Sequence, residues 1–261
     1  MKARGFTLVE VLVTVTVIAV LMGIGLPALH AVQGYARETT CTTRLRQMVV
    51  AAQAYANSSG ESAPPAVLYW QRSGVVVTQS WDFQSDASGT VQAGALWQFT
   101  NTPFEVQQCP AFDGESNSMG DPYTGYNYNT TYLGAEGTLP YVDGSGAVQD
   151  GWRAARLGTR LPQFAHPERT AAFGDGGWRS GANKYMRAPM NTVESNLPLV
   201  CAGTQAFRHT GGCTCCAYLD GHVGTVRQAE RGQLTTDALA KLVMGYPQNG
   251  FLSADDAAYG P

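Results

Sequence analysis

Residues 6–29 read FTLVEVLVTVTVIAVLMGIGLPAL, an apolar run of 24 residues in which Glu10 carries the only charge. An α-helix rises about 1.5 Å per residue, so this run is long enough to cross the roughly 30 Å hydrocarbon core of a bilayer. Lys2 and Arg4 precede the run. The sequence therefore predicts a membrane-spanning helix at its amino terminus.

Three explanations of this segment compete: a secretory signal peptide, a plain membrane anchor, and a helix that passes from the membrane into a protein assembly. A signal peptide has a shorter apolar core of about 7–15 residues and a small-residue cleavage site. The run here is longer, and the residues after Leu26 offer only weak small-residue pairs. A carboxylate inside hydrocarbon is costly, so we expect Glu10 to have a function and a partner.

A cut between Gly5 and Phe6 would expose an α-amino group four residues before Glu10, and this amine is the candidate partner. Residues 2–10, Lys-Ala-Arg-Gly-Phe-Thr-Leu-Val-Glu, resemble the leader and cleavage site of type IV prepilins and type II secretion pseudopilins. The resemblance implies that a prepilin peptidase removes the leader, residues 1–5, and methylates Phe6. It also implies that Glu10 aligns each incoming subunit with the amine of the preceding one.

The resemblance further implies a helix-kinking proline, here Pro27. Beyond it, apolar side chains recur every three or four residues between Leu45 and Ala56, which predicts an amphipathic helix that ends at Gly60. We predict one helix over residues 6–57, with 6–29 for the membrane and assembly and 30–57 amphipathic. A helix of about 78 Å is too long for this chain's core to bury, so its first half protrudes into a membrane or other copies.

Residues 60–261 read as a β-rich globular head with short strand candidates at 67–70, 74–77, 95–99 and 170–173. Residues 217–226 predict a hairpin in which Asp220-Gly221 forms a type I′ turn. The predicted fold class is α+β and type IV pilin-like, a long amino-terminal helix packed on this head.

Several head segments also resemble pseudopilin-like proteins that are abundant in planctomycetes and related bacteria. In that group a His is followed nine residues later by Asp-Gly, whereas ten residues separate His209 from Asp220 here. The resemblance supplies no biochemical activity, so the role of this motif stays unknown. The segments that carry it are Cys41 with 44–47, Cys109-Pro110, 126–129, 173–176, 208–212 and Asp220-Gly221-His222-Val223.

The six cysteines predict disulfides in an oxidising compartment. We expect Cys41 and Cys109 to join the helix to the head. Cys201 is expected to make one bridge to the hairpin, with Cys213 as the first candidate. On a strand Cys213 and Cys215 would share a face and Cys216 would point the other way, so they cannot all meet one partner.

Two groups of residues in the sequence offer metal ligands. His209, Asp220 and His222 with nearby thiols offer zinc ligands, but their spacing fits no zinc module, and a hydrogen-bonded His209 beside an Asp-Gly turn explains them better. Asp113, Glu115 and Asn117 alternate as oxygen donors for calcium, although Ser118 stands where an EF-hand loop requires Gly. We therefore expect no metal and no cofactor, with calcium as the weak alternative.

Composition and motifs exclude further classes of function. The net charge is −3 with 17 Lys and Arg, and the cations form no stripe, so no nucleic-acid partner is expected. No catalytic motif occurs: Asp175 within Gly174-Asp175-Gly176-Gly177 resembles a turn more than a general base, and we expect the protein not to be an enzyme. Tyr126, Tyr128 and Tyr132 are expected mostly in packing rather than on a sugar-binding face.

The sequence thus predicts a structural subunit of a type IV pilus-like or type II secretion pseudopilus filament. It would sit in the cytoplasmic membrane as a single-pass protein with its head on the extracytoplasmic side, and then in a periplasmic or cell-surface filament. Its expected partners are copies of itself, other pilins or pseudopilins, the prepilin peptidase and the inner-membrane assembly platform. The alternative is an extracytoplasmic enzyme or carbohydrate-binding protein tethered by an uncleaved helix.

Overall fold

The structure is a computed structural model of the whole chain, and most of its residues are described. They are residues 6–72, 75–86, 88–101, 104–114, 120–134, 136–138, 141–142, 145, 147–149, 158–179, 181–190, 203–241 and 249–261. Four residues with a predicted role lie outside these ranges: Gly5, Glu115, Asn117 and Cys201.

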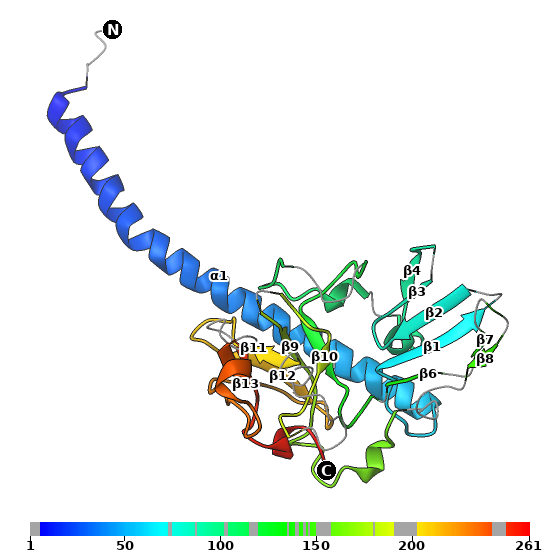
Figure 1. The fold of residues 1–261 in the computed structure, drawn as a ribbon. Helices are drawn as coiled ribbons and strands as arrows, with labels where there is room; N and C mark the ends of the chain where they lie inside the picture. The colour runs from blue at the N-terminus through cyan, green and yellow to red at the C-terminus, as the bar shows by residue number, and fades with distance from the viewer. Residues whose placement is uncertain are drawn as a thin grey trace.

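One long helix dominates the fold. Helix α1 runs over Leu8–Ser58, which confirms the predicted helix to within two residues at each end, and it contains Pro27. Gly60 has a φ of +63°, the left-handed conformation expected just after a helix. Figure 1 shows that the first half of α1 protrudes from the head and is curved, while the second half lies across the head.

The head is built from two main sheets. The first has the order β4-β3-β2-β1-β6, and all its neighbouring pairs are antiparallel except β1 with β6. Its strands are β1 (Val67–Arg72), β2 (Val75–Ser80), β3 (Phe83–Asp86), β4 (Val91–Ala93) and β6 (Glu136–Thr138). A separate pair joins β7 (Tyr141–Val142) and β8 (Val148–Gln149).

The second sheet has β9 at its centre, which pairs with β5, β11 and β12. Its strands are β5 (Tyr126–Asn129), β9 (Ala171–Gly177), β10 (Tyr185–Met186), β11 (Thr204–Ala206), β12 (Thr214–Tyr218), β13 (Val223–Val226) and β14 (Asn249–Gly250). Short helices complete the head: η1 (Ala95–Trp97), η2 (Phe104–Gln107), η3 (Leu161–Gln163), α3 (Asp237–Leu239) and η5 (Asp256–Ala258).

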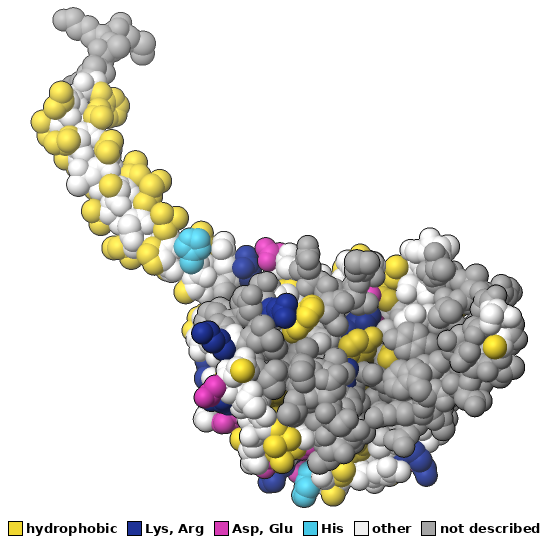
Figure 2. All heavy atoms as spheres, viewed as in Figure 1, with side chains coloured by type: hydrophobic (Ala, Val, Ile, Leu, Met, Phe, Trp, Pro, Cys, Tyr) yellow, Lys and Arg dark blue, Asp and Glu magenta, His cyan; other side chains and the backbone are white. Residues whose placement is uncertain are grey.

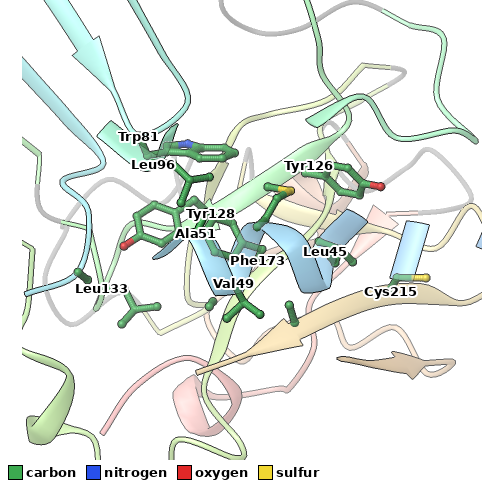
Figure 3. Close-up of a cluster of buried hydrophobic side chains, with 14 of the residues drawn as sticks. Leu45, Val49, Ala51, Trp81, Leu96, Tyr126, Tyr128, Leu133, Phe173 and Cys215 are labelled. Atoms are coloured by element: carbon green, nitrogen blue, oxygen red, sulfur yellow. The ribbon is translucent and has the colours of Figure 1, made fainter. Parts of the chain in front are cut away.

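The core lies between the second half of α1 and this central sheet. Leu45 of α1 is fully buried, and Figure 3 shows it near Phe173 of β9. Phe173 stacks on Tyr128 with ring centroids 4.9 Å apart, and the ring centroids of Trp81 and Phe173 are 5.6 Å apart. The predicted helix-on-head, pilin-like α+β architecture is therefore the one observed. Burial of each large side chain here stabilises the fold by about 1.5–3 kcal/mol.

Three local predictions were wrong. The strand expected at 95–99 is instead η1, because its backbone bonds locally: the Trp97 N–H donates to the Gly94 carbonyl at 3.3 Å and the Gln98 N–H to the Ala95 carbonyl at 3.4 Å. The hairpin at 217–226 forms, but of its turn residues only Gly221 has positive φ, +96°. The Tyr218 N–H donates to the His222 carbonyl, so three residues form the loop, which suits one left-handed Gly rather than a type I′ turn. The expected turn around Asp175 is the interior of β9.

A buried charge cluster joins two distant parts of the head. The Lys184 ammonium lies 3.0 Å from Asp82 Oδ1 and 3.1 Å from Asp121 Oδ2, and all three side chains are at most 8% exposed. Burial alone would lower the pKa of Lys184, but the charge of Asp82 raises it above its ordinary value. The ammonium therefore stays charged and compensates two carboxylates that have little contact with water.

Replacement of this lysine should destabilise the head strongly. We predict that Lys184→Met lowers the free energy of unfolding by about 3–5 kcal/mol, because it leaves Asp82 and Asp121 buried without their cation. Denaturant unfolding of the full chain in detergent, followed by tryptophan fluorescence, measures the effect. The matched control is Lys241→Met at an exposed position, which should change stability by less than about 0.5 kcal/mol. Equal stability of the two variants would contradict the role given to Lys184.

Candidate functional site

Two groups of residues stand out as candidates for function. One is the exposed apolar half of α1, which the sequence analysis assigned to the membrane and to assembly. The other is a buried group of thiols and an imidazole around Asp175, which we call the Asp175 cluster: Cys41, Cys109, Asp175, His209 and Cys215.

The first half of α1 has no cover within the chain. Its large apolar side chains are 49–82% exposed from Phe6 to Val32, and Figure 2 shows them along the protruding helix. Among the described residues, α1 is the one helix that is long and apolar enough to cross a membrane. None of its most apolar segment is buried within the chain. The core helix of a soluble protein would be buried here, so this surface requires a lipid or protein partner.

Glu10 closes the amino-terminal end of α1. Its Oε2 accepts hydrogen bonds from the Thr7 N–H and the Thr7 hydroxyl, each 2.8 Å long, and its own N–H donates to Thr7 Oγ1 at 3.3 Å. This reciprocal arrangement is a capping box, which satisfies two helix donors that would otherwise be unpaired. The second carboxylate oxygen, Oε1, accepts no hydrogen bond from the described part of the chain. The carboxylate thus caps its own helix and keeps one oxygen for another donor.

The Asp175 cluster forms where α1 first enters the head. Cys41 is the first fully buried residue of α1, and its Sγ donates to Asp175 Oδ1 at 3.4 Å. Cys109, which follows η2, donates to the same oxygen at 3.4 Å. The other oxygen, Oδ2, accepts from the Cys215 N–H at 2.7 Å and lies 3.1 Å from His209 Nε2. One carboxylate therefore connects four segments of the chain.

The strands explain why these side chains meet. Asp175 lies in β9 opposite Tyr126 of β5, and Cys216 of β12 pairs with Gly174. Cys215 belongs to the core beneath α1, whereas Cys216 belongs to a second core, so alternation along β12 directs the two thiols to opposite faces. His209 forms a backbone bridge with Cys213 at the start of the same hairpin.

Burial and the neighbouring groups shift the pKa values in the cluster. Burial raises the pKa of the Cys41 thiol well above its ordinary value, and the Cys41 contact raises that of Cys109. Burial alone would raise the pKa of Asp175 and lower the pKa of His209. The contact between the two side chains, helped by Arg208 and the Cys215 N–H at Asp175 and by Cys109 at His209, reverses both shifts. The pKa of Asp175 stays below its usual value, and that of His209 rises to about 10. Without a bound cation, the cluster therefore holds neutral thiols around a charged carboxylate.

The predicted disulfides need correction. The described cysteines are all free thiols, so the expected Cys41–Cys109 bond is absent. Instead of bonding to each other, both thiols donate to Asp175 Oδ1, which makes this carboxylate their shared partner. Cys213, expected to pair with Cys201, instead donates to the Thr210 carbonyl at 3.5 Å.

The structure also divides the His…Asp-Gly motif. The His209 side chain is buried in the Asp175 cluster, and the His209 N–H donates to the Cys213 carbonyl at 3.0 Å across the start of the hairpin. His222 Nδ1 lies 2.6 Å from Asp220 Oδ1, and both side chains are partly exposed on the hairpin turn. The calcium candidate is described only at Asp113, whose side chain is exposed.

Sequence reasoning missed Asp175 and Cys215 as members of one site. The signal that could have indicated Asp175 is its setting, a single charge within the apolar and glycine-rich run of β9. The glycines beside it allow close packing: a Cβ at Gly174 would lie 2.3 Å from Gln205 Oε1, and one at Gly176 would lie 2.4 Å from the Asn183 carbonyl oxygen. A charge in such a tight strand is expected to be buried and paired.

With this geometry described, comparison with known proteins adds one finding. Residues 1–26 match the family described as the prokaryotic N-terminal methylation motif. The amino terminus is therefore of the type IV pilin and pseudopilin kind, and this agrees with the long apolar helix on a β-rich head. No curated protein and no solved structure matches the chain significantly. The match covers only the amino-terminal tenth of the sequence, so it says nothing of the head.

Removal of the exposed half of α1 should change how the protein partitions. A chain that begins at His30 keeps the buried residues of α1, from Cys41 onward, and loses the uncovered apolar surface. We predict that this shortened chain stays in the aqueous phase, whereas the full chain remains with membranes after an alkaline carbonate wash. Membrane retention of the shortened chain would contradict the assignment of residues 6–29.

Proposed function

We propose that this protein is a structural subunit of a type IV pilus-like or type II secretion pseudopilus filament. A prepilin peptidase would cut after Gly5 and methylate Phe6. The cytoplasmic membrane would hold the subunit through α1, with the head on the extracytoplasmic side, until the assembly platform extracts it. The single observation that carries the proposal is the uncovered apolar half of α1, most of which lies within the methylation motif.

The exposed helix supports a transfer from lipid to protein. Side chains around its whole circumference are apolar and exposed, so lipid can cover it before assembly and helices of other subunits can cover it afterwards. Glu10 supports the same order of events. Its capping box uses Oε2, and Oε1 stays available for the terminal amine of a neighbouring subunit. In a filament the terminal amine would compensate the negative charge of Glu10, which lipid tails cannot do.

The rival function is a tethered enzyme or carbohydrate-binding protein. Tyr126 and Tyr128, two of the aromatic residues considered for a sugar-binding face, are each 1% exposed and belong to the core. The Tyr128 hydroxyl donates to the Pro64 carbonyl at 2.9 Å, so it is used within the fold. These observations favour a structural role for the head, and we propose that the protein is not an enzyme.

The state of the native amino terminus separates the two functions. We expect mass spectrometry of the protein from its own membranes to find a chain that begins with N-methylated Phe6. A tethered protein has no reason to lose its leader. A native chain that still begins at Met1 would contradict the proposed function.

Two substitutions at Glu10 separate its charge from its cap. Gln fits the same place in a capping box, so Glu10→Gln should keep the helix end and remove only the charge, whereas Glu10→Val removes both. We expect both variants to insert into the membrane normally and to reduce filament yield roughly tenfold or more, because the charge-assisted contact with the amine is lost in both. Electron microscopy of sheared filaments and immunoblots of membranes give the two readouts. Normal filaments from Glu10→Gln would show that the cap, and not the charge, matters.

A further inference from the structure

The Asp175 cluster has the donor set of a metal site. The side-chain ligand atoms of Cys41, Asp175, His209 and Cys215 all lie within 4.8 Å of one another, and all four residues are buried. A regular tetrahedron with edges of that length holds its centre at most about 2.9 Å from each corner, so small inward movements reach the zinc distances of about 2.0–2.3 Å. The four residues come from α1, β9, β12 and the segment before β12.

The imidazole in this cluster lacks a hydrogen bond. The His209 side chain is 1% exposed, and its Nε2 lies 3.1 Å from Asp175 Oδ2 as an ion pair. Both ring nitrogens are without a hydrogen-bond partner in the described residues. Nδ1 has no ion-pair partner among these residues either, and a buried polar atom of this kind calls for an explanation such as an ion. A metal bound through one ring nitrogen would supply it.

We propose that Cys41, Asp175, His209 and Cys215 bind one Zn²⁺ ion. Two thiolates, one imidazole and one carboxylate are a ligand set that suits zinc, and the absence of solvent around them suits a closed structural site. The divalent charge would offset two of the three negative charges that the ligating carboxylate and the two thiolates carry. This inference concerns the head and does not depend on the proposed filament function.

Cys109 has a different place in this site. It is outside the group of four, and its thiol donates to Asp175 Oδ1 at 3.4 Å. A hydrogen bond to a ligating carboxylate orients that ligand, and the loss of such a contact typically lowers metal affinity 10–100-fold. Cys109 is therefore a positioning residue, and we expect Cys109→Ser to keep the stoichiometry of one ion while weakening the affinity.

The ion would connect the helix to the head. Cys41 is where α1 becomes buried, and Asp175 and Cys215 belong to the two central strands. A zinc bridge would therefore take the place that the sequence analysis gave to a Cys41–Cys109 disulfide. It would fix the junction from which the apolar half of α1 extends.

The test uses the full chain, purified in detergent without chelators. We expect elemental analysis to find about one zinc per chain, and Co²⁺ added after zinc removal to give a thiolate-to-cobalt charge-transfer band. Cys215→Ser and His209→Ala should lose the ion and the band. The control is Cys216→Ser, next to Cys215 on the opposite face of β12, which should keep both. Near-ultraviolet circular dichroism shows whether each variant is folded.

The wild-type protein decides the question even if a variant fails to fold. Its zinc content and its Co²⁺ charge-transfer band are both measured without any substitution. A native chain in which Cys41 is oxidised to a disulfide, a folded wild-type chain that takes up neither Zn²⁺ nor Co²⁺, or a Cys216→Ser variant as impaired as Cys215→Ser would overturn the proposal.

Discussion

A single helix must satisfy two incompatible environments, and the rest of the structure depends on this constraint. From residue 41 onward α1 buries one face against β9 and β12, and before that point its apolar side chains have no cover in the chain. Since exposed apolar surface of this extent is unfavourable in water, the isolated chain cannot be its final state. A lipid bilayer or the helices of other subunits must complete it.

The head is organised to hold that helix in place. Its central strand, β9, presents Phe173 to the aromatic core and Asp175 to the junction with α1. Two contacts therefore act on neighbouring turns of the helix: apolar packing at Leu45 and Met48, and the polar cluster at Cys41. The second would strengthen considerably with a bound metal, because a structural ion contributes its binding energy to the folded state alone.

The sequence predicted the helix well and the polar cluster poorly, for a physical reason. Helix period and end signals are local, so a reading of neighbouring residues found α1 to within two residues. The cluster is assembled over large separations, since Asp175 lies 134 positions after Cys41, and only the sheet register brings them together. The disulfide between Cys41 and Cys109 was predicted only because an oxidising compartment favours such bonds. In the fold the two thiols share the Asp175 carboxylate instead. The turn of the hairpin was mispredicted for a similar reason. The turn type depends on the register in which β12 and β13 pair, and the Asp-Gly dipeptide does not determine that register.

The most direct measurement of the central claim asks what covers the exposed helix in cells. A photo-crosslinking amino acid at Val15, whose side chain is 58% exposed in the middle of the apolar run, reports its neighbours. Our account predicts that the crosslinked product, once assembly is active, is a second chain joined through its own amino-terminal helix, and that lipid is the neighbour when assembly is blocked. Crosslinks to lipid alone under both conditions would contradict the account.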